Sequence, residues 1–202
     1  QEVSWWPSYS LNTAIEDHAV RDLFLSKSFE DIRSNFRKSY KPLINSNLSK
    51  FSCGTLEDEN ISIWNEFKKL HHDNAKKNTR SGETWNLQYL GLKKKEGFLV
   101  YLKKEEKYVG FGYFNFSKDE CKYSVGVHDA SEMEKFKSPL GHLIQYYAIK
   151  FMKKEKIKWY KLGDEDFELK YSKNNSKINK INAFKKDFCS HEFPVITYSI
   201  KA

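Results

Sequence analysis

The sequence has little cysteine and no long apolar run, and both absences narrow its class. Its three cysteines, Cys53, Cys121 and Cys189, are widely spaced and odd in number. This disfavours a disulfide framework or a zinc site and favours a reducing compartment. No stretch approaches the ~18 uninterrupted apolar residues of a membrane span, and we find no apolar core of a secretory signal. We therefore expect a cytoplasmic protein with no metal and no membrane partner.

Concentrated charge of one sign is also missing. The formal net charge is +8, from 35 Lys and Arg against 27 Asp and Glu, but lysines alternate with glutamates through much of the chain. A scattered excess predicts a solvated surface rather than a nucleic-acid interface. The alternative is that the excess serves anionic ligands such as phosphates. The pattern leaves a homodimer open.

Length and aromatic content indicate one folded domain. The chain has 202 residues, of which 16% are aromatic, so it can bury a substantial core. Residues 1–21 are expected to form an irregular strap, because the segment lacks periodicity and carries Trp5 and Trp6 near its start. The folded domain is then expected over 22–202. Because the first residue is glutamine, we also expect a processed or trimmed chain.

The stretch 108–162 is typical of a strand–strand–helix–strand unit. The first strand, 108–116, is apolar almost throughout, which suits burial on both faces. In it Gly110 and Gly112 share one face, which indicates a bulge or the close approach of a ligand or a second backbone. The second strand, 121–128, alternates. Its apolar and aromatic side is expected to consist of Cys121, Tyr123, Val125 and Val127.

The helix after these strands is expected to begin at Ser138 and Pro139, a cap followed by a first-turn proline. Lys135 and Lys137 precede its free N–H groups, which makes a ready anion site. A strand over 157–162 follows. Its end at Leu162 is followed by an acidic segment that is expected to form a loop.

The rest of the chain supplies further helices and strands. Other strands are expected over 22–25, 98–102 and 195–200. Other helices are expected from Ser28 until Pro42 breaks the helix, over 62–77, from Ser81 to about Gly97, and over 180–188. The predicted fold class is therefore α/β, one domain with a mixed sheet flanked by helices.

Four segments carry a resemblance to a known family. They are FRKSYKPLIN (36–45), LHHDNAKKNTRSGETWNLQY (70–89), SPLGHLIQYYAIKFMKK with KWYKLGDEDF (138–167), and KINAFKKDF (180–188). In this order they resemble the Fem-like (FemAB-type) branch of the GNAT acyltransferase superfamily, the type found beside surface-polysaccharide and sugar-nucleotide genes. The likeness covers roughly residues 22–190. Such proteins often carry two GNAT-type domains, so the resemblance implies that this chain holds little more than one.

The chain departs from the family pattern at three points. AKK stands at 75–77 where an AGR-like triplet is usual, and the FKKDF segment lacks the usual glycine. The superfamily's glycine-rich phosphate loop is reduced to Lys137 and Gly141.

The resemblance implies a GNAT-like mixed sheet and an N-acyltransferase. The expected reaction moves an acyl group from acyl-CoA, acting as co-substrate, to the amine of an amino sugar that is nucleotide-linked. Such chemistry needs a neutral amine, a polarised carbonyl and correct positioning of the two. One alternative is aminoacyl transfer from charged tRNA, as in the Fem type. Another is a non-catalytic domain that binds nucleic acid or glycans.

The resemblance also implies where acyl-CoA would bind. A splayed pair of strands would expose backbone N–H groups to the pantetheine arm, and the strand containing Phe111, Gly112 and Tyr113 is the candidate. The pyrophosphate would rest at the start of the following helix. The residues expected there are Lys137, Ser138, Gly141 and His142. Any strand–helix unit has such a helix start, so a purely structural role is the alternative.

Three residues are candidates for catalysis. His71 lies where the family has its histidine and could accept a proton from the attacking ammonium, although a lone inward histidine is often a hydrogen-bonded core residue. Glu165, which follows a strand, is the second candidate base, with a solvated loop as the alternative. Lys185 on the last helix could stabilise the developing oxyanion.

Substrate-binding candidates come from the same segments. The planar guanidinium group of arginine suits a diphosphate, and aromatic rings could stack on a base or sugar. The alternative is that the arginines lie on a solvent-exposed helix face and the aromatic residues belong to the core. The candidates are Arg37, Lys38, Tyr40, Arg80, Trp85, Gln88 and Asp164.

Overall fold

The computed structural model describes residues 13–25, 27–136, 139–166 and 176–200. Its strands are β1 (Thr13–Phe24), β2 (Ser52–Leu56), β3 (Gly97–Lys104), β4 (Lys107–Phe116), β5 (Glu120–His128), β6 (Trp159–Asp166) and β7 (His191–Ile200). Its helices are α1 (Phe29–Ser34), α2 (Tyr40–Asn45), α3 (Ile61–Ala75), α4 (Gly82–Lys93), α5 (Ala130–Phe136), α6 (Leu140–Lys154) and α8 (Ser176–Lys186).

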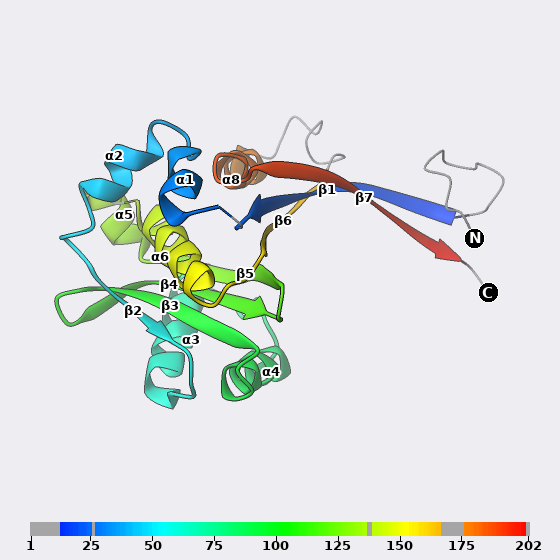
Figure 1. The fold of residues 1–202 in the computed structure, drawn as a ribbon. Coiled ribbons are helices and arrows are strands. Elements are labelled where there is room, and N and C mark those ends of the chain that lie inside the picture. The colour runs from blue at the N-terminus through cyan, green and yellow to red at the C-terminus, as the bar shows by residue number, and fades with distance from the viewer. Residues whose placement is uncertain (1–12, 26, 137–138, 167–175, 201–202) are drawn as a thin grey trace.

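The strands form one mixed sheet in the order β2-β3-β4-β5-β6-β1-β7. Every neighbouring pair is antiparallel except β5 and β6, which run parallel and are joined through α5 and α6. A parallel pair needs a crossover of this kind because its strands start at the same edge. Beyond β6, β1 and β7 continue together as a ribbon that extends away from the other strands (Figure 1).

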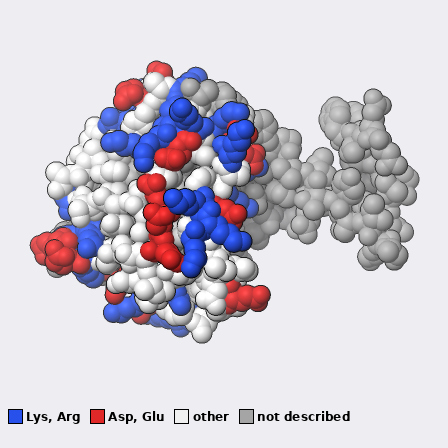
Figure 2. All heavy atoms as spheres, turned by 60° about the horizontal axis from the view of Figure 1, so that its bottom comes forward, with Lys and Arg blue, Asp and Glu red and all other residues white. Residues whose placement is uncertain are grey.

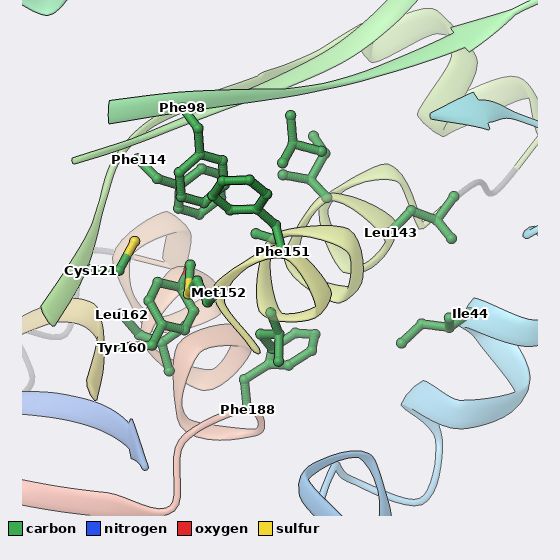
Figure 3. Packing of buried hydrophobic residues seen from close by; sticks show 14 of the residues in the cluster. Ile44, Phe98, Phe114, Cys121, Leu143, Phe151, Met152, Tyr160, Leu162 and Phe188 are labelled. Carbon is green, nitrogen blue, oxygen red and sulfur yellow. The ribbon is translucent and has the colours of Figure 1, made fainter. Parts of the chain in front are cut away.

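One face of the sheet packs on α6, which supplies more residues to the larger core than any other element does. Leu140, Ile144 and Met152 on α6 are fully buried. Figure 3 shows α6 lying between the rings of Phe98 and Phe114 on the sheet and the side chains of the outer layer, where Ile44 and Phe188 point toward it. A helix between the second and third strands of the strand–strand–helix–strand unit, as the sequence predicts, is confirmed.

The opposite face carries α3 and α4 over a smaller aromatic core. Trp64 and Phe67 on α3 and Trp85 on α4 pack edge to face, with ring centroids 5.2 to 5.9 Å apart. Such geometry is favoured by the charge distribution of aromatic rings. Both helices begin at polar caps, where Asn60 accepts from the N–H of Ile63 and Ser81 accepts from the N–H of Thr84. The start predicted at Ser81 is confirmed.

The bounds of several elements differ from those predicted. Strand β1 begins at Thr13, so the strap expected over 1–21 is a strand in its second part; residues 1–12 lie outside the described part. Pro42 does not end a helix but lies in the first turn of α2. The first four N–H groups of a helix have no partner within it, so proline costs nothing there.

Strand β5 does not keep one set of side chains on one side. Tyr113 pairs with Val125, whereas the next residue, Phe114, pairs with Tyr123, so Ser124 is the extra residue of a β-bulge. The bulge turns the strand over. Cys121 and Tyr123 therefore face the α6 core while Val125 faces α3 and α4. The prediction of a single apolar side was wrong, because a bulge leaves no mark in the alternation.

Candidate functional site

The sheet opens between β5 and β6. The two strands pair only through residues 120–122 and 159–161. Beyond this point β5 runs on to His128 beside β4, and β6 runs on to Asp166 beside β1. Ligands of mixed and parallel sheets collect where neighbouring strands separate in this way. The opening is therefore the first candidate for a functional site.

A glycine lies where β6 turns away. Arg21 pairs with Gly163 but Asp22 pairs with Lys161, so Leu162 is the extra residue of a bulge in β6. Gly163 has a φ of +107°, a backbone conformation that residues with a Cβ rarely adopt. Bulges bend a strand and occur next to active sites. β6 pairs with β1 on both sides of this bulge, whereas its pairing with β5 ends at Lys161, just before the bulge.

Side chains from β5 and α8 lie at the two sides of the opening. His128 ends β5, and its Nε2 lies 3.3 Å from the point that a Cβ on Gly141 would occupy. Lys185 of α8 reaches the other strand, with its Nζ 2.8 Å from the equivalent point on Gly163. The basic residue predicted for catalysis therefore lies at the opening, although its role stays a prediction.

The described start of α6 is packed rather than open. Pro139 and Leu140 are buried, whereas Gly141 is half-buried, with His128 and Phe184 next to it. The proline at the N-cap makes no side-chain hydrogen bond. Two residues expected to bind the pyrophosphate here, Lys137 and Ser138, lie outside the described residues.

His142 is a packing residue of this helix start. Its ring meets Tyr40 and Phe184 edge to face, with centroids 4.2 and 5.0 Å apart. Burial lowers the pKa of His142 to about 4. Burial, with a smaller effect from the neighbouring His142, also lowers the pKa of His128 to about 4. Both imidazoles are therefore neutral at physiological pH, and no described residue hydrogen-bonds the buried Nε2 of His128.

Three substrate-binding candidates lie in the outer layer near α8. Asp187 accepts hydrogen bonds from Arg37 at 2.8 Å and from the Tyr40 hydroxyl at 3.1 Å. Burial raises the pKa of Tyr40, and Asp187 adds to this effect. These contacts link the start of α2 to the end of α8. Lys38, which lies between Arg37 and Tyr40 in the sequence, is exposed. The structure thus gives Arg37 and Tyr40 a structural partner within the chain.

The strand expected to expose N–H groups is closed. β4 pairs with β3 along one edge and with β5 along the other. Phe111 and Tyr113 are fully buried in the aromatic core, and a Cβ on Gly112 would lie 2.5 Å from Ile144 of α6. The expectation that this strand exposes its N–H groups was wrong, and cofactor binding by Phe111, Gly112 and Tyr113 stays a prediction. The glycines admit a helix side chain.

A second group of predicted residues comes together on the opposite face of the sheet. The rings of Trp85 on α4 and His71 on α3 meet edge to face, with centroids 5.2 Å apart. The guanidinium carbon of Arg80 lies 6.0 Å from the centroid of the Trp85 ring. Gln88 follows Trp85 by three residues on α4, so it extends the same helix face. His72 lies 6.3 Å from the Trp85 ring. We call these five residues the α3–α4 site.

The α3–α4 site contains unusual buried polar atoms. His71 Nδ1, His72 Nε2, Trp85 Nε1 and Gln88 Oε1 are buried, and none has a hydrogen-bond partner among the described residues. The pKa of His71 is lowered by burial and, to a smaller extent, by the positive charges of Arg80 and His72. A neutral imidazole of this kind can accept a proton, as the role predicted for His71 requires.

The two groups approach each other at the end of β5. Asn74, three residues after His71 on α3, donates from its side-chain amide to the carbonyl oxygen of His128. The α3–α4 site therefore lies on one face of the sheet near the opening, and the start of α6 and Lys185 lie on the other. The remaining predicted acids, Asp164 and Glu165, belong to β6 and pair with β1. Placing them in a loop was wrong, and their side chains lie outside the described part.

Sequence reasoning missed His72, Asn74 and His128. The signal for His128 was available, since a histidine that ends a strand just before a crossover lies at the carboxyl edge of the sheet. His72 and Asn74 flank the predicted His71, but only the fold places them against Trp85 and β5.

Three further observations apply to the described residues as a whole. On the face shown in Figure 2, basic and acidic side chains are interspersed over the described surface. In the described residues, no helix is long and apolar enough to span a bilayer. Across the same residues, no three His, Cys, Asp or Glu side chains gather as a metal site would require.

Comparison with known proteins yields matches among solved structures alone. No protein-family model matches the sequence. No curated protein matches it. FemX superposes with a TM-score of 0.65 at 12% identity, over 89% of this chain and 61% of FemX. This chain has a Fem-like GNAT fold. The resemblance found in the four sequence segments is therefore confirmed for the fold.

Two further structures share the Fem-like GNAT fold. The C-terminal domain (DUF2156) of an Agrobacterium fabrum protein assigned to lysylphosphatidylglycerol synthetase has a TM-score of 0.67 at 12% identity, over 92% of this chain and 61% of that chain. A tandem GNAT protein from the clavulanic acid biosynthesis pathway has a TM-score of 0.51 at 10% identity, over 92% of this chain and 53% of that one. This chain thus spans about three-fifths or less of each neighbour.

Proposed function

We propose that this Fem-like GNAT chain transfers an acyl group from an activated ester to an amine, and that the donor is an aminoacyl ester such as charged tRNA. The observation that carries the proposal is the opening between β5 and β6, which has His128 and Lys185 at its sides. The similarity to FemX supports the same reading, because the alternative drawn from the sequence was a Fem-type transfer.

The transfer step needs little chemistry from the chain. The amine nitrogen attacks the ester carbonyl, the C–N bond forms, the C–O bond breaks, and the carrier leaves as an alcohol. The ammonium proton goes to a base before the attack, and His71 is suited to this because its lowered pKa keeps it neutral. Lys185 would stabilise the negative charge that develops on the carbonyl oxygen.

The packing at the start of α6 favours an aminoacyl ester over acyl-CoA. Coenzyme A would need the free N–H groups of this helix for its pyrophosphate. Pro139 and Leu140 are buried there, and Gly141 is half-buried, with His128 and Phe184 next to it. The residues described at this helix start therefore do not fit a diphosphate.

Acyl-CoA stays the second candidate donor because one neighbour, the tandem GNAT protein, is described in relation to AcCoA. The step would be the same, except that a C–S bond breaks and a thiol leaves. An amino sugar linked to a nucleotide would then be the expected acceptor. For either donor, we expect the protein to act in the cytoplasm.

The deciding experiment offers both donors to the same protein. Purified chain is mixed with tRNA carrying radiolabelled amino acids, or with acetyl-CoA, together with peptide amines and nucleotide-linked amino sugars. We expect label to move from tRNA to an amine, and His71→Gln to lower kcat at least about tenfold, a typical loss for a general base. Transfer from acetyl-CoA alone would establish the second candidate.

Controls separate chemistry from folding. Lys185→Ala should lower kcat with little change in KM, whereas Lys186→Ala, an exposed neighbour on the same helix, should behave as the unmodified chain does. A folded sample that transfers nothing from either donor would overturn the proposal. Salt-sensitive RNA binding in that sample would instead indicate a non-catalytic nucleic-acid-binding domain.

A further inference from the structure

The α3–α4 site holds more unpaired polar atoms than a core tolerates. Trp85 is only 2% exposed, yet its indole N–H has no partner among the described residues. Leaving one buried donor unpaired costs about 1–3 kcal/mol, so such atoms are normally paired with protein or water. Here four atoms, from four neighbouring side chains, are buried without a hydrogen-bond partner among the described residues. Their grouping indicates a place built to receive something polar.

The unpaired groups include both donors and an acceptor. The indole Nε1 of Trp85 can only donate, and the guanidinium of Arg80 can only donate. The Oε1 of Gln88 can only accept, and a neutral His71 imidazole can offer a lone pair at one nitrogen and an N–H at the other. A phosphate or a carboxylate would use the donors but leave Gln88 Oε1 unpaired. The ligand must therefore present acceptors and donors together.

The charge of the α3–α4 site further limits the class of ligand that it can bind. Arg80 is partly buried, and burial lowers its pKa. No carboxylate of the described residues forms an ion pair with it. A guanidinium binds a carboxylate through two parallel hydrogen bonds. One arginine matches one carboxylate, whereas a nucleotide diphosphate would carry more negative charge than this site compensates.

We infer that the α3–α4 site binds an α-amino carboxylate, the free amino acid that acts as acceptor. Its carboxylate lies between Arg80 and the indole N–H of Trp85. Its amine faces Gln88 Oε1 and the imidazole of His71. This inference rests on the proposed transfer to an amine and names the acceptor class as an amino acid rather than an amino sugar.

Binding is tested in the absence of any donor. The full chain is screened with the standard L-amino acids by thermal shift, and the best one is then compared with its N-acetyl derivative, its methyl ester and glucosamine. We expect a melting temperature that rises with amino-acid concentration. The N-acetyl derivative lacks the ammonium and the ester lacks the carboxylate, so each should bind at least about tenfold more weakly. Glucosamine should give no shift.

Two variants locate the ligand. Arg80→Gln should weaken binding of the best amino acid at least about tenfold, as loss of a charged hydrogen bond predicts. Lys77→Gln, an exposed neighbour with the same change of charge, should leave the dissociation constant unchanged. Circular dichroism of both variants checks that they fold.

The inference is overturned if a folded Arg80→Gln chain keeps full affinity, if the methyl ester binds as well as the acid, or if no amino acid binds at millimolar concentration. In that last case water fills the site. Because no donor is present, binding without transfer would refute the proposed reaction alone. Transfer to amines that lack a carboxylate would refute this inference alone.

Discussion

Two glycines of β4 determine how closely α6 approaches the sheet. A Cβ on Gly112 would lie 2.5 Å from the Ile144 methyl and 3.0 Å from the ring of Phe114. At Gly110 the nearest atom of Ile144 would be 3.3 Å away. Ile144 is fully buried, so it has no free direction in which to move. The glycine pair therefore serves helix packing.

Gly112→Ala is expected to destabilise the fold by about 1–3 kcal/mol, the usual cost of forcing an extra methyl group into a packed core. The free energy of unfolding in urea measures this. Gly82→Ala is the matched control, because nothing lies within 4 Å of a Cβ at Gly82, the first residue of α4. Equal stability of Gly112→Ala and the unmodified chain would contradict the packing described here.

His142 makes stability depend on pH. Its pKa is about 4 in the folded chain against 6.5 as its ordinary value, so the unfolded chain binds the proton more readily. Stability from this residue is full above the ordinary value and is lost as pH falls toward the folded value. The loss between about pH 7 and pH 5 should be roughly 1–2 kcal/mol.

His142→Phe is the variant that isolates this effect, since a phenyl ring can keep the edge-to-face contacts with Tyr40 and Phe184. We expect urea unfolding of this variant to change less between pH 7 and pH 5 than that of the unmodified chain. Its remaining pH dependence reports on His128 and the carboxylates. Identical pH profiles for the two chains would refute the buried, neutral state of His142.

At the scale of elements, a carboxylate directly after α8 links this helix to Arg37 and to α2, beside its aromatic contacts. Asp187, directly after α8, accepts from the Tyr40 hydroxyl of α2 and from Arg37, while its backbone carbonyl accepts from the N–H of Arg37. Phe188 then enters the core against Phe36 and Tyr40. This arrangement keeps Lys185 beside Gly163.

Asp187→Ala should lower the free energy of unfolding by about 1–2 kcal/mol. Tyr40 is only 7% exposed, and the substitution leaves its hydroxyl group without a hydrogen-bond partner. The substitution should also lower transfer activity, since α8 carries Lys185. Asp119→Ala is the control: Asp119 pairs with Lys158 at 2.8 Å on the exposed surface, where removal of an ion pair has little effect. A midpoint in urea unchanged by Asp187→Ala would show that α8 is held by its aromatic contacts alone.

For the whole molecule, the net charge of +8 bears on the choice of donor. If charged tRNA is bound through several phosphates, each contact releases counterions, so affinity falls with salt. We expect the dissociation constant for tRNA to rise about tenfold to hundredfold between about 50 and 200 mM salt, measured by filter binding. Amino-acid binding at the α3–α4 site should change far less. A flat response of tRNA binding would contradict a phosphate-based interface.

The sequence by itself determined the elements and much of the site's membership. Caps such as Ser81, the apolar stripe of α6 and the alternation of short strands depend on neighbours a few residues away, so they can be recognised locally. The segment 70–89 likewise contains His71, predicted as a base, and Arg80, Trp85 and Gln88, predicted to bind substrate, and the fold brings His71 and Arg80 to the ring of Trp85.

Only the tertiary structure decided where the sheet opens. The bulges at Ser124 and Leu162 come from the register between strands far apart in sequence, and no local pattern marks them. The first turns β5 over, and the second lies directly after the end of the β5–β6 pairing, so the opening lies beside His128 and not at β4, where the glycines suggested it. The same long-range packing closed the start of α6, because the rings that cover it come from α2 and α8.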